Sequence, residues 1–592
     1  MIMLNLIKIT ALCCLLSITN YSDITAQNYR RPLKIKMKLS SHFGDYRAGH
    51  WHSGIDITTK GKSGYKVYAV ESGYVCRIKT SFWGYGKAMY LKLNDGRYAV
   101  YGHLQRFSPD IEEHIRHQQM KEKRYYKDIY FKPGQFSVKK GDYIALSGQT
   151  GAGAPHLHFE IRNQNNITIN PLKGFYSMPD SKPPLVDYIV VKRYRSYGLA
   201  NYNDMEFLKL EGEAPSFFIT DTVAVYGRTV FAVSAFDPNG GYNYSLYGAS
   251  LIFDSTEVFS FEHNRLDYST GSQIDYVRDN SLKTLVEKSK GVKADNDKNA
   301  FYRLYIQPDD IQSFYGDYSY PAGIIDAESL ASGVHSLQVN LFDISGNISR
   351  IKLYVRKAEF KKPVVTNIYT DSNSYILELG SFPASYKPQI QARKAPYLPY
   401  CTIPSHFNMF ERTAKLLSSD YAYDYRIRII DEHSDFSPWA VFNPRQESSE
   451  VIPHADYLEI FALKTDLSAL NDYESHYLDI MPLNDNYVKV MAPVLSNDVF
   501  FEPELLIKSG SNGFYIFDSG GTAYSPDSTI RLQVMKNHLY CPTIMQITQP
   551  VFDGAGGYTF DILPPDLLFK DDVIIRVERN KLALKASHSS LY

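Results

Sequence analysis

The apolar and polar positions at the start of this chain follow the patterns of β-strands. Short alternating or apolar segments are separated by turns rich in Gly, Asn and Asp, and they cover residues 32–40, 66–70, 74–78, 89–93 and 97–101. The turn Asn94-Asp95-Gly96 between the last two segments is typical of a β-hairpin. The pattern therefore predicts a compact antiparallel sheet.

One segment of this first region has a helical pattern instead. From Ser108 to about Arg124 the chain is highly charged, and Ile111 and Ile115 fall on one helical face. We therefore expect a helical insertion at about residues 108–130. His114 and His117 lie three residues apart on it, but their charged neighbours favour a solvated surface over a metal site.

Strand patterns continue to the C-terminal end. They cover residues 223–236, 249–253, 257–261, 333–342 and 351–355, and later 375–379, 425–430, 505–508, 513–517, 530–534 and 573–577. The expected fold is mainly β: an antiparallel-sheet domain followed by two or three β-sandwich-like modules of immunoglobulin or fibronectin type. The predicted boundaries are 1–26 for a signal peptide, then 27–178, 183–358, 361–455 and 456–592.

The composition supports a β-rich, exported protein. Tyr and Phe are abundant, at 48 and 32 residues, and aromatic residues suit sheets. With 64 basic and 64 acidic residues, the chain lacks the positive charge of a nucleic-acid-binding protein. Export is predicted from the N-terminal segment, which contains Lys8, the apolar run 9–18 and a possible cleavage site before Gln27. The final location stays open between the periplasm, the outer membrane and the outside of the cell.

The cysteines do not form a recognisable framework. Cys13 and Cys14 lie within the predicted signal peptide, which leaves Cys76, Cys401 and Cys541 at wide spacing. An odd number at this spacing indicates neither a disulfide scaffold nor a zinc cluster. Cys76 is expected to be a core thiol, and a bridge between Cys401 and Cys541 stays open.

Two segments carry potential metal ligands. His52 and Asp56 would lie roughly 13 Å apart in an extended strand, so the chain must bend between them, and Gly54 would allow the bend. In the segment His156-Leu157-His158-Phe159-Glu160, alternate residues point the same way, so both histidines share one face of a strand. Two histidines and one carboxylate form a typical catalytic zinc set.

Further motifs complete a family pattern. The chain contains HSGID from His52, YGHL from Tyr101, GQTG from Gly148 and HLHFEIR from His156, followed by Asn170-Pro171. With these motifs, about residues 43–171 resemble the lysostaphin/LytM-type zinc metalloendopeptidases, which cleave the peptide parts of bacterial peptidoglycan. The resemblance implies a Zn²⁺ cofactor.

The resemblance also implies roles for individual residues. It implies that His52, Asp56 and His158 bind the zinc ion, and that His103 and His156 stand beside the open coordination position as catalytic residues. Which of His103 and His156 acts as the base stays open. Glu160 is a weaker candidate for the base, because Arg162 could equally be its partner. Tyr46 could donate a hydrogen bond to the tetrahedral intermediate.

These observations favour an exported zinc endopeptidase that hydrolyses peptide cross-links or stem peptides of peptidoglycan. The alternative is a LytM-type protein without catalytic activity that activates a separate cell-wall amidase. A surface adhesin would account for the β modules but not for the histidines. The C-terminal modules are expected to hold the first domain at the cell envelope or to bind an envelope protein.

Overall fold

The computed structural model describes most of the chain after the predicted signal peptide. The described residues are 29–47, 50–151, 153–194, 202–291, 300–307, 310–358, 363–371, 374–382, 386–408, 411–417, 423–431, 435–445, 450–453, 457–465, 479–493, 514–517, 520–535, 538, 543–552, 558–563 and 573–578. The predicted signal peptide 1–26, the predicted strand 505–508 and Cys541 lie outside them. Within these residues, no helix has both the length and the apolar character needed to cross a membrane.

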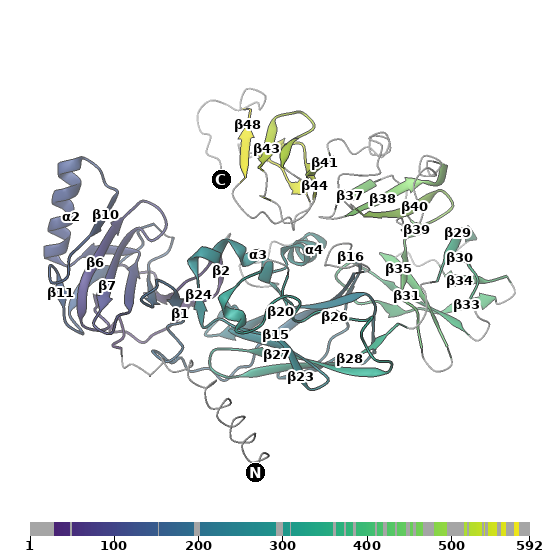
Figure 1. Cartoon of the computed structure of the whole chain (residues 1–592), viewed down its shortest axis with the longest axis horizontal. Coiled ribbons are helices and arrows are strands. Elements are labelled where there is room, and N and C mark those ends of the chain that lie inside the picture. The colour runs from purple at the N-terminus through teal and green to yellow at the C-terminus, as the bar shows by residue number, and fades with distance from the viewer. Residues whose placement is uncertain are drawn as a thin grey trace, which may run out of the picture.

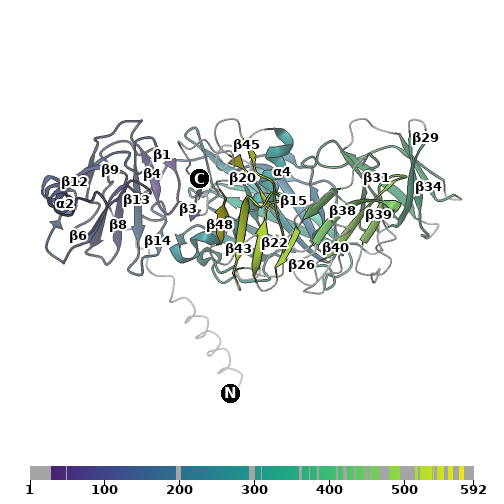
Figure 2. The same ribbon diagram turned by 90° about the horizontal axis from the view of Figure 1, so that it is seen from above.

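The described chain is a row of β-rich units, as predicted (Figures 1 and 2). The purple first unit stands at one end of the row and the green strands of residues 365–442 at the other. A teal unit lies between them. The yellow strands near the C-terminal end lie above the middle of the row in Figure 1 and within its length in Figure 2.

The first unit consists of antiparallel sheets. The larger sheet runs in the order β1 (Leu39–Ser41), β4 (Ile55–Thr58), β13 (His156–Arg162), β8 (Tyr98–Gly102), β7 (Lys87–Leu93), β6 (Gly73–Thr80) and β10 (Lys127–Tyr130). At its margins, β11 (Ser137–Val138) pairs with β6, and β14 (Thr168–Ile169) pairs with β13. The smaller sheets are β5 (Lys66–Tyr68), β12 (Tyr143–Ser147) and β9 (Leu104–Phe107), and the pair β2 (Tyr46–Arg47) and β3 (His50–Trp51).

The alternation of strand β13 places one face in the core, as predicted. Leu157, Phe159 and Ile161 are fully buried in the hydrophobic core of the first unit. Strands of both the larger and the smaller sheet contribute to the same core, so it lies between them. The opposite face of β13, with its histidines, is therefore held by a rigid packed layer.

The predicted helix is present as α2 (Pro109–Glu122). Ser108 is its N-cap residue, and Ile111 and Ile115 are buried, as expected from the pattern. The end of the insertion differs from the expectation, because residues 127–130 form strand β10 and pair with β6. A strand there satisfies the backbone groups of a sheet edge that would otherwise be left open.

The second unit is a sandwich of two sheets. One sheet contains β16 (Tyr202–Phe207), β15 (Leu185–Tyr194), β20 (Arg228–Asn239), β21 (Tyr242–Tyr244), β25 (Phe301–Arg303) and β26 (Ile325–Asp326). The other contains β17 (Glu211–Glu213), β18 (Ser216–Phe218), β19 (Val223–Val225), β28 (Ile348–Lys357), β27 (Val334–Phe342), β22 (Gly248–Phe253) and β23 (Thr256–Glu262). The strands predicted at residues 249–253, 257–261, 333–342 and 351–355 are present, and they form the hairpins β22–β23 and β27–β28.

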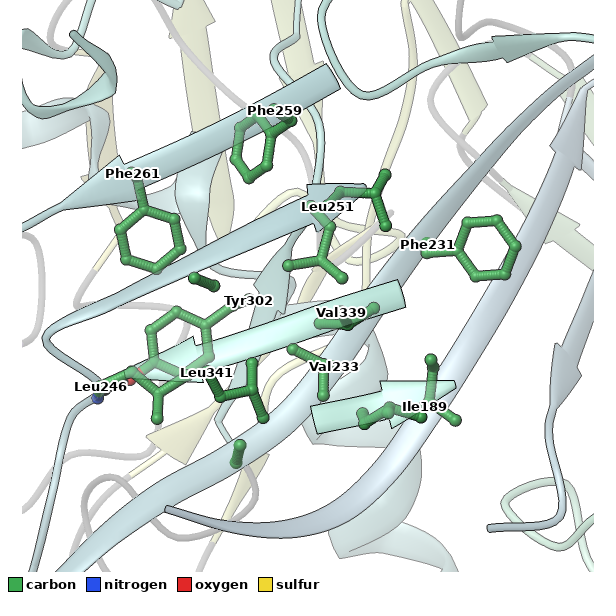
Figure 3. Packing of buried hydrophobic residues seen from close by; sticks show 14 of the residues in the cluster. Ile189, Phe231, Val233, Leu246, Leu251, Phe259, Phe261, Tyr302, Val339 and Leu341 are labelled. Carbon is green, nitrogen blue, oxygen red and sulfur yellow. Dashed lines mark hydrogen bonds between the residues drawn. The ribbon is translucent and has the colours of Figure 1, made fainter. Parts of the chain in front are cut away.

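Side chains from both sheets form the core of this sandwich. Figure 3 shows Phe231 and Val233 of one sheet packed with Leu251, Val339 and Leu341 of the other. All five are fully buried.

This unit also contains short helices that the sequence analysis missed. They are η1 (Tyr268–Gln273), α3 (Ile274–Val277), α4 (Asn280–Lys290) and η2 (Ser313–Tyr315). The side chain of Asp279 caps α4 by accepting from the backbone N–H of Leu282, and Leu282 and Val286 are buried one turn apart. A capping residue followed by this spacing is the signal that was overlooked.

The rest of the described chain forms smaller antiparallel sheets, and the predicted strands within it are present. One group is β29 (Val365–Asp371), β30 (Ser374–Leu379), β33 (Ser405–Asn408), β34 (Thr413–Leu417), β31 (Lys387–Arg393), β32 (Cys401–Thr402), β35 (Asp424–Ile430) and β36 (Ala440–Phe442). The next is β37 (Glu450–Pro453), β38 (Tyr457–Leu463), β39 (Asp479–Pro482) and β40 (Tyr487–Pro493). The last is β41 (Phe514–Phe517), β42 (Gly521–Tyr524), β43 (Ile530–Val534), β44 (Thr543–Ile547), β45 (Val551–Phe552), β46 (Tyr558–Thr559), β47 (Ile562–Leu563) and β48 (Ile574–Val577).

The first two units share a packed junction. Phe43 and Trp51 belong by sequence to the first unit but are buried in the hydrophobic core of the sandwich. The ring of Trp51 lies 4.9 Å from that of His263 and 5.6 Å from that of Phe314, centroid to centroid. Strand β14 also pairs with β24 (Arg265–Leu266) of the second unit. The two units are therefore joined by a continuous sheet and a shared core, and the exact domain boundaries stay predictions.

Candidate metal centre

Neighbouring strands bring the sequence motifs together. In the pairing of β4 with β13, Asp56 lies directly opposite His158. On the other side of β13, His158 lies opposite Gly102 of β8, and His103 follows at once. The motifs around residues 52, 103 and 156 thus meet at one place in the sheet, although about a hundred residues separate the first from the last.

His52, Asp56 and His158 form a tight, buried cluster. His52 Nε2 lies 3.0 Å from Asp56 Oδ1 and 3.1 Å from His158 Nδ1, and the last two atoms are 2.9 Å apart. Each residue is less than 9% exposed. Three ligands about 2.0–2.2 Å from one tetrahedral zinc ion would lie about 3.3 Å from one another, so the cluster has nearly the size of a zinc site.

The outer hydrogen bonds of the histidines show that lone pairs point into this cluster. His52 Nδ1 lies 2.6 Å from the carbonyl oxygen of His42, to which it donates, so its Nε2 is unprotonated. His158 Nε2 lies 2.9 Å from Glu160 Oε1 and donates to that carboxylate, so in the neutral imidazole the lone pair is on Nδ1, which faces Asp56. Burial disfavours the charged form of His158, but Asp56 and Glu160 outweigh it and raise the pKa of His158 to about 9, which shows that this position favours a positive charge. Either a proton or a metal cation can supply that charge, and two imidazole nitrogens with one carboxylate oxygen are a donor set that fits Zn²⁺.

Gly54 contributes by its size rather than by unusual backbone angles. A Cβ atom at this position would lie 2.4 Å from the carbonyl oxygen of Phe159 and 2.8 Å from Cγ of Glu160. A larger residue would therefore push the segment after His52 away from β13. The expected bend between His52 and Asp56 is present, but Gly54 is needed there for the close approach of two strands.

His103 and His156 stand beside the cluster. Their ring centroids are 4.6 Å apart, and His156 Nε2 lies 3.6 Å from Asp56 Oδ1. His103 Nδ1 lies 3.0 Å from the carbonyl oxygen of Thr150, and His156 Nδ1 lies 2.8 Å from that of Ala154. A carbonyl can only accept, so each Nδ1 carries the proton and each Nε2 is left with a lone pair.

The environment keeps His103 neutral. Burial, followed by the neighbouring His158 and His156, lowers the pKa of His103 to about 4. The backbone of His103 is also unusual, with a φ of 57° in the left-handed region. Such a conformation in a residue other than glycine costs energy and is found preferentially at functional positions.

A second layer of side chains holds His158 through Glu160. Glu160 is fully buried, and Arg162 donates to its Oε2 at 2.6 Å. Tyr85 donates to its Oε1, and so does Tyr268 of the second unit, at 2.9 Å. Burial opposes ionisation of Glu160, but Arg162 and His158 outweigh it and lower its pKa to about 2. Glu160 is thus an ionised anchor for His158 and is unsuited to act as the base.

Arg47 is a member of the site that sequence analysis missed. Its Nη2 lies 3.4 Å from Oδ2 of Asp56, the oxygen that faces away from the histidines, and donates to Ser41 Oγ at 2.6 Å. Arg47 therefore directs Asp56 to present a single oxygen, Oδ1, to the cluster. Its place just before the histidine motif was the available signal. Tyr268 had none, because it comes 108 residues after Glu160.

The other candidate residues lie elsewhere. The hydroxyl of Tyr46 lies 3.5 Å from Asn280 Nδ2 of α4, and a role for Tyr46 in the reaction stays a prediction. The ring of His114 packs against Phe131 and Phe136, and His117 is exposed. The helix histidines are thus part of the surface and packing of α2.

Two cysteines lie among the described residues. Cys76 is only half-buried, and its thiol donates to the carbonyl oxygen of Tyr90 at 3.3 Å. Cys76 sits at an irregularity in the pairing of β6 with β7, which turns it partly outward and explains why it is less buried than expected. Cys401 is exposed and free.

Comparisons with known proteins assign a family to this part of the chain. Residues 50–171 match the model of Peptidase family M23. The murein hydrolase activator NlpD of Escherichia coli is 30% identical over 136 residues, which are 23% of this chain and 28% of that protein. An uncharacterized metalloprotease of Haemophilus influenzae is 32% identical over 152 residues, 24% of this chain and 26% of that protein. The chain thus spans less than a third of the length of these relatives.

A solved structure is also similar to this region. The catalytic domain of the antimicrobial peptidase lysostaphin from Staphylococcus simulans is 26% identical. The match covers 23% of this chain and 90% of that domain, with a TM-score of 0.17. The match to the family model, the motifs and the converging ligands together identify residues 50–171 as a domain of peptidase family M23.

Proposed function

We propose that this chain is an exported zinc metalloendopeptidase that hydrolyses peptide cross-links or stem peptides of bacterial peptidoglycan. The observation that carries the proposal is the complete donor set: the lone pairs of His52 and His158 converge with Asp56 in a buried cluster. His103 and His156 stand next to this cluster with a lone pair on Nε2. The site thus has both metal ligands and proton acceptors.

The roles follow from the donor set. A bound Zn²⁺ would supply Lewis acidity, lowering the pKa of water and polarising the scissile carbonyl. One of His103 and His156 takes the proton of the attacking water at Nε2, and the other stabilises the oxyanion, while a proton is returned from this pair to the nitrogen of the departing amine. The carbonyl oxygens of Thr150 and Ala154 hold these two imidazoles in the required tautomer. Glu160 and Arg47 keep His158 and Asp56 in position.

Activation of another hydrolase is the second candidate function. It is favoured by the relatives whose names describe murein hydrolase activators. An activator, however, needs only a binding surface, whereas this site has three buried ligands, two further histidines and a strained backbone at His103. A peptidase accounts for all of these features.

Peptidoglycan digestion tests the proposal. The purified chain from residue 27 onward is incubated with peptidoglycan, with added zinc or after chelation, and released muropeptides are identified by mass spectrometry. We expect new peptide ends that require zinc and that disappear in His158→Ala, while His117→Ala on the exposed face of α2 cleaves like wild type. If wild type releases no peptide ends but stimulates an added wall amidase, the chain is an activator.

We also propose that the C-terminal β modules hold the peptidase at the cell envelope. Their position after an exported catalytic domain supports this proposal, together with the family match that stops at residue 171. Removal of residues 361–592 should release the enzyme from the envelope fraction and reduce cleavage of the cell's own wall. Unchanged localisation and cleavage would refute an anchoring role.

A further inference from the structure

A second cluster of carboxylates lies where the first unit meets the sandwich. Asp180 comes from the segment that links the two units, Asp237 from strand β20 and Asp343 from the turn after β27. Each offers an oxygen within 4.8 Å of the others. The cluster is separate from the peptidase site in sequence and contains no histidine ligand.

The cluster is buried to a degree that is unusual for three acids. Asp237 and Asp343 are each 2% exposed, and Asp180 is half-buried. Oδ1 of Asp237 is buried without a hydrogen-bond partner among the described residues. A buried, unpartnered carboxylate oxygen costs several kcal/mol, by order of magnitude, unless a positive charge or a donor satisfies it.

No described side chain supplies that charge. The bonds made by the cluster's oxygens come from backbone N–H groups and one amide: Lys182 donates to Asp180, and Ser345 and Asn347 donate to Asp343. Among the described residues, the cluster has no salt-bridge partner.

Protonation alone is a poor substitute for a cation. Burial, then Asp180, Asp343 and Asp45, raise the pKa of Asp237 to about 8. A protonated Asp237 would gain most by donating to a neighbouring carboxylate, yet the described structure shows no hydrogen bond between members of the cluster. Their oxygens lie within 4.8 Å of one another, which is close enough for all three to contact one shared ligand.

From this geometry we propose that Asp180, Asp237 and Asp343 bind a hard divalent cation, with Ca²⁺ as the best match. Oxygen ligands at 2.3–2.6 Å from Ca²⁺ lie at most about 5 Å from one another, which agrees with the observed spacing. The donor set is oxygen only, which disfavours zinc. A nearby hydrogen bond joins the segments that carry two of the ligands. Ser345 Oγ, two residues after Asp343, donates at 3.3 Å to the carbonyl oxygen of Met178, two residues before Asp180.

The ion would connect the linker to both sheets of the sandwich. Asp237 belongs to one sheet and Asp343 directly follows a strand of the other. On the side of the peptidase unit, Asp45 accepts from the backbone N–H of Ser245, and its carbonyl oxygen accepts from the N–H of His52. A cation at the cluster would therefore stabilise the junction that supports the first zinc ligand.

Metal titration of the zinc-loaded chain tests this site. Tb³⁺, a luminescent substitute for Ca²⁺, should be excited through nearby Tyr244 and displaced by Ca²⁺, and Ca²⁺ should raise the unfolding temperature. In Asp237→Asn the affinity should fall by about tenfold or more. Asp326→Asn, on strand β26 beside the start of β20, should bind as wild type.

A stability comparison makes the outcome decisive. Without a cation, Asp237→Asn replaces a carboxyl group whose ionisation is disfavoured by burial and by the neighbouring acids, so its unfolding temperature should match or exceed that of wild type. With Ca²⁺ it should fall below wild type. The proposed site would be refuted if wild type shows no saturable binding up to about 10 mM Ca²⁺. It would also be refuted if Ca²⁺ raises the unfolding temperature of Asp237→Asn as much as that of wild type. If Asp237→Asn does not fold, the less buried Asp180→Asn gives the same test.

Discussion

The contact from Tyr268 to Glu160 predicts that the sandwich contributes to zinc affinity. The hydroxyl of Tyr268 donates to Glu160 Oε1 at 2.9 Å and accepts from Arg162 Nη2, also at 2.9 Å. The same carboxylate oxygen accepts from His158 Nε2. Removing the hydroxyl in Tyr268→Phe should therefore loosen a zinc ligand through one intermediate residue, without changing any ligand itself.

The size of this effect can be worked out from the contacts. A hydrogen bond to a charged group contributes about 1.5–3 kcal/mol. Tyr268 is 43% exposed, so water can partly replace its hydroxyl, and Tyr85 still donates to the same oxygen. We expect a loss of about 1 kcal/mol, which corresponds to roughly fivefold weaker zinc binding, somewhat less than the roughly 10–100-fold loss typical of outer-layer substitutions.

The assay is a competition between the purified chain and a chromophoric zinc chelator. Tyr320→Phe is the matched control, because Tyr320 is 36% exposed and its hydroxyl accepts from Arg228 far from the site. If Tyr268→Phe binds zinc as wild type does while Tyr85→Phe binds it more weakly, the second unit only packs against the site. An equal loss in Tyr320→Phe would show that the effect is not specific to the site.

Further substitutions test catalysis, packing and the contact between strands β16 and β35. His103→Ala should reduce peptidoglycan cleavage about a hundredfold or more with zinc content unchanged by elemental analysis, and loss of the metal would contradict a role in proton transfer. Phe159→Ala should lower the free energy of unfolding by about 3–5 kcal/mol in urea, because this ring is fully buried, and a change below about 1 kcal/mol would refute its place in the core. For Glu206, burial opposes ionisation, but Arg426 and Arg193 outweigh it and lower its pKa from 4.5 to about 2. Above pH 4.5 the free energy of unfolding of wild type should exceed that of Glu206→Gln by about 3 kcal/mol, and this difference should be lost as the pH falls toward 2. A difference that does not depend on pH would contradict this pairing.

Local sequence patterns determine those parts of the structure that could be predicted. The alternation in residues 156–161 was sufficient to place two histidines on one face, because side chains of a strand alternate whatever it packs against. Helix α2 followed from the spacing of Ile111 and Ile115. The pairing of Asp56 with His158 did not follow from any local pattern. The donor types suggested that these residues share a metal, and the family resemblance implied it.

The rest depended on contacts between distant parts of the chain. Tyr268 reaches Glu160 from another unit, and nothing in its neighbourhood marks it. Helix α4 was missed because it lies within a region of strand patterns. The acidic cluster shows the same difficulty, since Asp343 in its turn is satisfied by local hydrogen bonds, and only the fold brings Asp180 and Asp237 to it.

The placement of Trp51 in the core of the sandwich constrains how this peptidase could be recombined. The indole is 3% exposed and sits one residue before the zinc ligand His52. Burial of a side chain of this size contributes about 2–3 kcal/mol, so a catalytic segment transplanted without the sandwich would expose an aromatic surface beside its own metal site. Exchange of catalytic domains between such proteins should therefore succeed when the sandwich is transferred with the peptidase, and fail when the exchange point falls between them.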